Sequence, residues 1–209
     1  MQSDSCTCGH IPVTTGVTAT RELEIRPATA DRWNDLTELF ERRGPRGGKP
    51  VVDGCWCQFW HLRGRAYGSG FGEPNRLRLE EEVRSTPPPG LLAFRDGEAV
   101  GWCRVGPREH FARLEASPRL ARIDGVPVWS LVCFYVHPAA KRQGVAAALL
   151  DAAGAFAAEH GAPALEAYAV DAGHPNIDAY TGYLPMFLAA GYDVVKDAGR
   201  RTIVRRRLI

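Results

Sequence analysis

The hydrophobic pattern along the chain is densest over residues 129–161, where it predicts a strand, a turn and a helix in succession. Residues 129–136 are apolar or aromatic apart from Ser130, a composition typical of a strand buried on both faces. Residues 137–144 are mostly polar and contain a proline and a glycine, as turns do. Beyond this turn, apolar side chains recur on one helical stripe, at Val145, Leu149, Ala152 and Phe156. Gly161 stands where such a helix should end.

The same patterns predict the other elements of one sheet with covering helices. Alternating or short apolar runs predict six more strands, at 22–26, 91–94, 99–105, 164–170, 192–196 and 202–208. We expect three more helices, one capped by Thr29, one within 74–85, and one capped by Thr181 that ends at Ala190. The strands on either side of the helix after Val145 should run parallel, because that helix is a crossover. The expected fold class is therefore α/β, with a mixed sheet.

Length and composition fit one globular domain. With 209 residues, 45% of them hydrophobic, the chain can bury a substantial core, and we expect a single domain over 21–209 after a mobile tail at 1–20. The formal net charge of +2 is too close to neutral for a strong nucleic-acid or membrane field. No apolar run approaches the ~20 residues of a membrane span, and the N-terminus lacks a signal-peptide pattern. We therefore expect a cytoplasmic location.

The cysteines predict free thiols and not a metal site. Cys103 and Cys133 lie in apolar strand-like runs, where buried thiols are expected. The other four form two C-x-C pairs, Cys6/Cys8 and Cys55/Cys57. With histidines nearby these pairs could form a zinc site, but their spacing departs from that of structural zinc sites. No metal is expected.

The start of the helix after Gly144 has the features of an anion site. The first four backbone N–H groups of a helix have no intrahelical partner, and the helix dipole favours negative charge there. Lys141 and Arg142 add positive charge, while Gly144 and Ala146 leave room for a phosphate to approach the backbone. The segment has neither the Gly-Lys-Ser/Thr of a Walker loop nor a G-x-G-x-x-G pattern. We expect a phosphorylated small molecule as the ligand.

The hexapeptide Lys141-Arg142-Gln143-Gly144-Val145-Ala146 resembles the Q/R-x-x-G-x-G/A signature of the GNAT superfamily of N-acetyltransferases. It departs from that signature in having lysine at the first position. The strand before it, the helix after it and Ala190-Gly191-Tyr192 further on are similar to the same family. The resemblance implies a GNAT-type acyltransferase fold, in which a mostly antiparallel central sheet is splayed between the fourth and fifth strands.

In that family the turn holds the pyrophosphate of acetyl-coenzyme A (acetyl-CoA), and the strand before it pairs with the pantetheine arm. The resemblance therefore implies acetyl-CoA as the cofactor and direct transfer of its acetyl group to a primary amine. A backbone N–H near Tyr135 or Val136 is expected to polarise the thioester carbonyl. The implied cofactor-binding residues are Phe134, Tyr135, Val136, Lys141, Arg142, Gln143, Gly144, Val145, Ala146 and Ala147.

Two residues are candidates for proton transfer. Glu166, on the strand beside the cofactor strand, is the candidate base, and a solvated or salt-bridged glutamate is the alternative. Many family members carry a tyrosine at the position that Phe187 occupies here. Tyr183 lies one turn earlier on the expected helix and is the candidate acid, with ring packing as the alternative. A mechanism without an acid stays open, because a thiolate is a tolerable leaving group near a helix N-terminus.

The rival to an enzyme is a sensor module that binds acyl-coenzyme A without catalysis, a function that Phe187 favours. The aromatic segment 54–62 is either a helix packed on the core, a wall of the acceptor pocket, or an aromatic site for a cationic amine. The acceptor is left open, as a small molecule or a peptide amine, and so is a homodimer. Neither a nucleic acid nor a membrane is expected as a partner, because an arginine-rich hairpin is usually a solvated surface.

Overall fold

The computed structural model describes residues 23–43, 52, 54–173 and 176–208. The tail expected at 1–20 lies outside this part of the chain. The strands are β1 (Leu23–Pro27), β2 (Gly90–Arg95), β3 (Glu98–Pro107), β4 (Trp129–Val136), β5 (Ala164–Ala169), β6 (Asp193–Asp197) and β7 (Thr202–Arg207). The α-helices are α1 (Trp33–Glu41), α2 (Gly64–Gly68), α3 (Glu73–Glu82), α4 (Ala112–Glu115), α5 (Val145–Glu159) and α6 (Leu184–Ala189). The 3-10 turns are η1 (Ala30–Arg32), η2 (Arg108–His110), η3 (Pro138–Ala140) and η4 (Asn176–Thr181).

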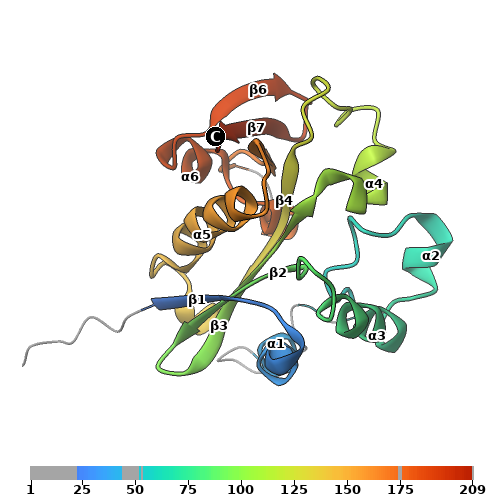
Figure 1. Cartoon of the computed structure of the whole chain (residues 1–209), viewed down its shortest axis with the longest axis vertical. Coiled ribbons are helices and arrows are strands. Elements are labelled where there is room, and N and C mark those ends of the chain that lie inside the picture. Colours follow the sequence, from blue (N-terminus) through green and yellow to red (C-terminus); the bar gives the residue numbers. More distant parts are fainter. Residues whose placement is uncertain (1–22, 44–51, 53, 174–175, 209) are drawn as a thin grey trace, which may run out of the picture.

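The strands form one seven-stranded sheet in the order β1-β2-β3-β4-β5-β7-β6. Every neighbouring pair is antiparallel except β4 and β5, which are parallel. These two strands are the ones that α5 connects, as a helical crossover requires. Figure 1 shows β1, β2 and β3 at one end of the molecule and β6, β7 and α6 at the other, with α5 between them. The predicted mixed, mostly antiparallel sheet is confirmed.

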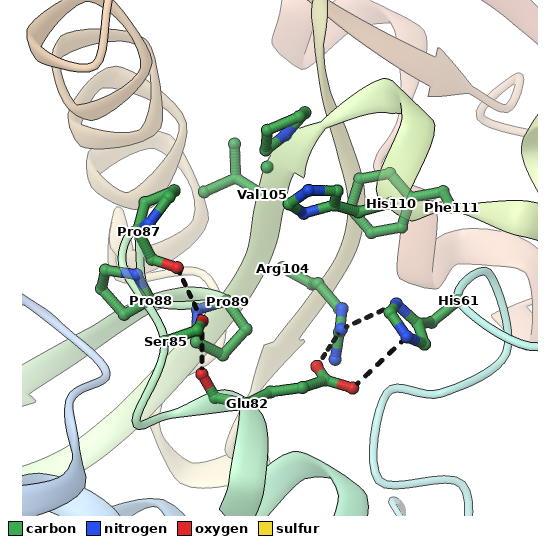
Figure 2. Close-up of a pocket in the computed structure, with 12 residues that line it drawn as sticks. His61, Glu82, Ser85, Pro87, Pro88, Pro89, Arg104, Val105, His110 and Phe111 are labelled. Atoms are coloured by element: carbon green, nitrogen blue, oxygen red, sulfur yellow. Dashed lines mark hydrogen bonds and ion pairs between the residues drawn. The ribbon is translucent and has the colours of Figure 1, made fainter.

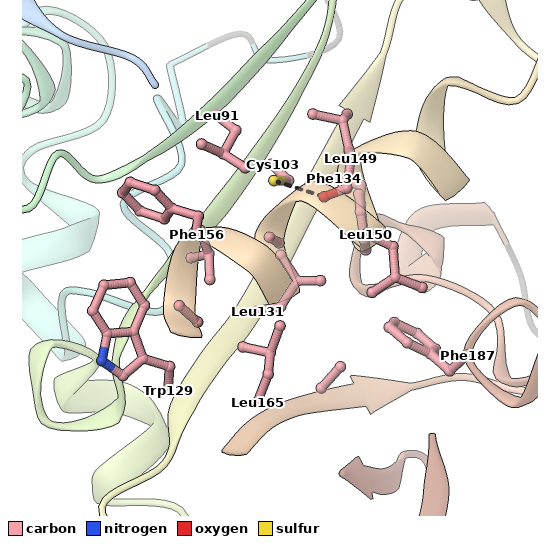
Figure 3. Close-up of a cluster of buried hydrophobic side chains, with 14 of the residues drawn as sticks. Leu91, Cys103, Trp129, Leu131, Phe134, Leu149, Leu150, Phe156, Leu165 and Phe187 are labelled. Carbon is pink, nitrogen blue, oxygen red and sulfur yellow. Dashed lines mark hydrogen bonds between the residues drawn. The ribbon is translucent and has the colours of Figure 1, made fainter. Parts of the chain in front are cut away.

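Helix α5 covers one face of the sheet. Val145, Leu149 and Phe156 are buried as the helical stripe predicts, whereas Ala152 is only partly buried. Figure 3 shows Leu149 and Phe156 in one cluster with strand residues such as Leu131. Removing this apolar surface from water contributes a favourable free energy of folding of about 25 cal/mol per Å². The layer between α5 and the sheet is therefore the main core.

Helices α1 and α3 cover the opposite face. Phe40 of α1 meets the rings of Trp102 and Tyr135 edge-on, with centroids 5.8 and 5.9 Å apart. Leu79 of α3 belongs to the same buried cluster. Because the central strands are buried on both faces, their sequences are apolar at nearly every position.

The segment 54–62 consists of turns, so the helix expected there is wrong. Trp56 and Cys57 have φ angles of +47° and +54°, and such left-handed residues do not propagate a right-handed helix. Both side chains are nevertheless buried, as is that of Trp60. The expectation that this segment packs on the core is therefore confirmed.

Two predicted helix caps differ from the structure. Thr29 is the N-cap residue of η1, which runs directly into α1, but its side chain makes no capping hydrogen bond. Thr181 ends η4, and the N-cap of α6 is Tyr183, whose extended φ of −91° and ψ of 140° place it just outside the helix. The helix begins later than predicted because residues 176–181, which the pattern assigned to a loop and a cap, form η4.

Helix α5 packs closely on β3 at Gly101. A Cβ atom built at this glycine would lie 2.6 Å from Val145 Cγ1 and 3.2 Å from Leu149 Cδ1. The missing side chain therefore sets how near the first turn of α5 comes to the sheet.

We expect Gly101→Ala to lower the free energy of unfolding by about 1–3 kcal/mol, because the added methyl group overpacks the contact between α5 and β3. Urea denaturation measures the change. Gly125→Ala is the matched control, since a Cβ there meets no atom within 4 Å, and it should alter stability by less than about 0.5 kcal/mol. Equal stability of the two variants would contradict the close packing.

Candidate active site

Strands β4 and β5 pair only over their first residues. The register joins Trp129, Ser130 and Leu131 to Leu165, Glu166 and Ala167. Beyond Leu131, β4 continues to Val136 with β3 as its partner. The backbone groups of residues 132–136 that face β5 therefore have no strand partner in the described part of the chain. Such groups require water or a ligand to satisfy them.

A β-bulge lies at the point where the two strands part. Arg104 of β3 pairs with Cys133, and Val105 pairs with Leu131, so Val132 is an extra residue in β4. Bulges bend the strand that carries them. After the bulge, Phe134 again packs in the core on the α5 side.

The turn between β4 and α5 exposes the first amides of the helix. Gly144 is the N-cap, with a left-handed φ of +79°, and Arg142 has a φ of +61°. The carbonyl of Gly144 accepts from the amide of Ala148. The amides of residues 145–147 precede this first bond of the helix and have no intrahelical partner. Successive amides in left-handed and helical conformations form concave sites that bind anions.

The open strand edge and the exposed amides line the same cleft, which has a volume of about 530 Å³. Its lining residues come from β4, from the turn and first residues of α5, and from the segment 179–186. Lys141 and Arg142 are its charged members, and no described aspartate, glutamate or histidine lines it. The cleft therefore favours an anionic ligand.

Nine of the ten predicted cofactor-binding residues line this cleft, and Gln143 is the exception. Its Nε2 donates to the carbonyl of Ala139 at 2.8 Å, and Arg95 of β2 donates to its Oε1. The side chain fastens the turn to β2 instead of facing the cleft. Tyr135 contributes to the cleft but turns its ring toward Phe40 on the other face.

Glu166 lies where β4 and β5 are still paired, opposite Ser130, and it does not line the cleft. Its side chain is 1% exposed. Oε1 accepts from Arg205 Nη2 at 2.7 Å, while Oε2 accepts from Arg108 Nη1 at 3.2 Å and from the Tyr168 hydroxyl at 3.3 Å. These contacts match the salt-bridged alternative. The role of Glu166 as a base stays a prediction, without support from its position.

Arg108 is the centre of this buried network, and the sequence pattern did not reveal it. It lies in η2 with a side chain 1% exposed, and it also donates to Glu115 Oε1 at 2.6 Å and to the carbonyl of Leu120 at 2.6 Å. Burial lowers its pKa, but Tyr168, Glu115 and Glu166 outweigh that effect and raise the pKa overall. A charge so fully paired can remain ionised in the core.

Two phenols line the cleft opposite β4. Tyr183, the candidate acid, is one of them, although it precedes α6 instead of lying on it. Phe187 is fully buried, with its ring 6.3 Å from that of Phe134 and 5.5 Å from that of Tyr192. The second phenol is Tyr180, which the sequence analysis did not single out. Its one signal was an aromatic residue within a polar loop.

Two of the thiols meet on the face of the sheet away from α5, whereas Cys103 lies on the α5 side. Cys57 and Cys133 have their Sγ atoms 3.2 Å apart, and Trp102 Nε1 donates to Cys57 Sγ at 3.0 Å. Hydrogen bonding with Cys133 lowers the pKa of Cys57 against the opposing effect of burial. Cys103 and Cys133 are free thiols as predicted, but only Cys103 is fully buried, and Cys133 is partly buried. Within the described ranges no group of three or more His, Cys, Asp or Glu side chains could hold a metal ion, and the pair Cys6/Cys8 lies outside them.

A separate small pocket beside β3 holds a second charged cluster (Figure 2). Arg104 is 3% exposed, forms an ion pair with Glu82 and lies 3.5 Å from His61 Nδ1. Gln58 Nε2 donates to Glu82 at 2.9 Å. Burial raises the pKa of Glu82, but Arg104 and His61 outweigh burial and lower it overall. Its contribution to stability is therefore present at neutral pH and is lost as the pH falls through this lowered pKa.

The family model for the acetyltransferase (GNAT) family matches residues 56–183, and the chain belongs to that family. The resemblance inferred from the hexapeptide is therefore confirmed, and acetyl-CoA is the acetyl donor of this family. No curated protein matches the sequence. No helix in the described ranges has the length and apolar character needed to cross a bilayer.

Solved structures share the fold at low sequence identity. PaiA N-acetyltransferase from Thermoplasma acidophilum, in complex with coenzyme A, is 15% identical with a TM-score of 0.52, covering 89% of this chain and 99% of its own. A mosquito arylalkylamine N-acetyltransferase-like protein, 5b, is 11% identical with a TM-score of 0.57, covering 90% and 100%. The polyamine N-acetyltransferase of Drosophila melanogaster, which forms N-acetylagmatine, is 12% identical with a TM-score of 0.52, covering 88% and 97%.

We expect Glu166→Gln to lower the free energy of unfolding by about 3–5 kcal/mol, because a neutral amide removes the one buried carboxylate that Arg108 and Arg205 share. Each arginine then keeps a single, partly exposed carboxylate partner, Glu115 or Asp124. Glu115→Gln is the control. Glu115 also binds Arg108, but its side chain is 32% exposed, so the loss should stay below about 1 kcal/mol. Urea denaturation compares the two. A stable Glu166→Gln protein whose kcat/KM falls about 100-fold would instead assign the base role to Glu166.

Proposed function

We propose that the protein is an N-acetyltransferase that moves the acetyl group of acetyl-CoA directly to a primary amine. The observation that carries this proposal is that the unpaired edge of β4 and the exposed amides of α5 line one cleft. A ligand with a diphosphate and a long arm rich in amide groups complements both features. Membership of the acetyltransferase family supports the same donor.

In this proposal the diphosphate binds the amides of residues 145–147. Their N–H groups are donors, and the helix dipole favours the negative charge. Lys141 and Arg142 are exposed beside them and add positive charge. Gly144 supplies the left-handed turn that presents the amides, a conformation that costs a glycine little. The amide groups of the pantetheine arm pair with the free edge of residues 134–136.

Acetyl transfer requires a neutral amine, a polarised carbonyl and a thiolate that can leave. We assign polarisation of the carbonyl oxygen to a backbone N–H near Tyr135 or Val136, because negative charge develops on that oxygen as the amine attacks. The Tyr183 hydroxyl then protonates the departing thiolate. The amine loses its proton to water, since no described carboxylate or imidazole lines the cleft.

The alternative function is an acyl-CoA sensor with the same fold. Two observations favour it. Phe187 is fully buried in the core, and Glu166 forms ion pairs with Arg108 and Arg205 away from the cleft. Neither side chain lines the cleft. The phenols of Tyr180 and Tyr183 in the cleft favour the enzyme.

Thiol release from acetyl-CoA in the presence of a panel of amines separates the two functions. We expect amine-dependent release of free coenzyme A from the enzyme. A protein that coenzyme A stabilises against heat, but that releases no thiol with any amine, would instead be the sensor.

Ala146→Glu tests, in the same assay, whether the diphosphate binds at the first turn of α5. A glutamate in the first turn of α5 favours the helix dipole, so the fold should persist, while its charge repels the ligand. The KM for acetyl-CoA should rise about tenfold or more. Ala155→Glu, at an exposed position of the same helix, is the control that should leave this KM unchanged.

We expect Tyr183→Phe to lower kcat about 100-fold, because it removes the proposed acid, while the KM for acetyl-CoA changes little. Steady-state kinetics measure both constants. Tyr192→Phe is the matched control, since the Tyr192 hydroxyl is buried away from the cleft and its loss should leave kcat unchanged. A full loss of kcat in Tyr180→Phe, with normal activity in Tyr183→Phe, would move the acid to Tyr180.

A further inference from the structure

A second hollow, with a volume of about 330 Å³, borders the cofactor cleft. The two spaces share the side chain of Tyr180, which lines both. Aromatic residues of the segment 54–62, the loop after α4 and the turn between β6 and β7 form its walls. The lining residues are Phe59, Trp60, Arg113, Ser117, Arg119, Leu120, Tyr180, Ala198, Arg200 and Arg201. The four charged residues among them are all arginines.

Aromatic rings hold two of these guanidinium groups in place. The Arg113 Cζ atom lies 4.2 Å from the ring centroid of Phe59, and its Nε donates to the carbonyl of the same residue at 2.5 Å. The Arg201 Cζ atom lies 5.3 Å from the ring centroid of Trp60. Stacked and hydrogen-bonded arginines lose less conformational freedom when they bind an anion. Both terminal nitrogens of Arg113 make no hydrogen bond within the described ranges.

The other two arginines lie at the exposed rim. Arg119 follows α4, and Arg200 is in the turn between β6 and β7. No described aspartate or glutamate lines the hollow beside Arg113 and Arg119, and the charge argument depends on these two arginines. A cationic group would meet like charge here, and the protein's own guanidinium groups already lie over the faces of Phe59 and Trp60. A carboxylate or a phosphate would meet planar donors that match its geometry.

We propose that this hollow is the acceptor subsite and that the acceptor is a small amine carrying an acidic group. The acidic end binds Arg113 and Arg119, and the amine reaches the cofactor cleft beside Tyr180. This inference rests on the proposed acetyl transfer. In that reaction the amine nitrogen forms a bond to the acetyl carbon, the carbon–sulfur bond breaks, the nitrogen loses a proton and the sulfur leaves as the thiol.

Matched pairs of amines test the substrate class with the full-length protein and acetyl-CoA. One pair is 4-aminobutanoate and 1,4-diaminobutane, and the other is 2-aminoethyl phosphate and 2-aminoethanol. Thiol release should give a kcat/KM about tenfold or more higher for the acidic member of at least one pair. The first pair reports on a carboxylate and the second on a phosphate. Higher activity with 1,4-diaminobutane and 2-aminoethanol would overturn the inference and leave the transferase function standing.

Arg119→Gln tests the subsite itself. The KM for the preferred acidic amine should rise about tenfold, because one charge-assisted contact is lost, while the KM for acetyl-CoA stays unchanged. Arg122→Gln is the matched control from the same loop, since Arg122 binds Glu115 and does not line the hollow. Equal KM values for the acidic amine in both variants would contradict the assignment.

Failure of the proposed function gives a different result, in which no amine releases thiol although coenzyme A still stabilises the protein. Calorimetry with 4-aminobutanoate and 2-aminoethyl phosphate then decides the inference alone. Binding that Arg119→Gln weakens supports an anion subsite, and no binding overturns it.

Discussion

The parting of β4 from β5 is the constraint on which the rest of the site depends. Buried backbone groups without partners are costly, so a sheet normally keeps its strands paired along their shared length. Here the pairing ends after Leu131 and Ala167. At the closed end, the buried carboxylate of Glu166 binds β5 to Arg205 of β7 and to Arg108 of η2. At the open end the bulge at Val132 bends β4, and the backbone edge beyond it has no strand partner from β5.

The arginine-rich hairpin of β6 and β7 is therefore not a plain solvated surface. Arg205 binds Glu166 and Asp124, and Arg206 donates to the carbonyl of Ala190 at the end of α6. These arginines connect β7 to β5, to the loop before β4 and to the end of α6. The turn of the same hairpin carries Arg200 and Arg201 to the hollow beside the cofactor cleft. One hairpin thus supports the paired ends of β4 and β5 and forms part of the wall of the proposed acceptor subsite.

Local sequence was enough to predict the strand–turn–helix unit, because its signals are continuous: an apolar strand, a left-handed Gly144 and an apolar helical stripe. It could not reveal the partners of Glu166, since Arg108 and Arg205 come from distant segments without periodicity. The turns at 54–62 were missed because Trp56 and Cys57 adopt positive φ angles that non-glycine residues rarely take. Tyr180 was missed because only tertiary contact brings its loop to β4.

The most direct test of the central claim is the backbone amide spectrum of the ¹⁵N-labelled protein during titration with coenzyme A. If the diphosphate binds where α5 begins, the amide resonances of residues 144–147 should shift most, together with those of residues 134–136 on the free edge of β4. Saturating coenzyme A that shifts neither group, or that shifts resonances elsewhere in the molecule instead, would contradict the account.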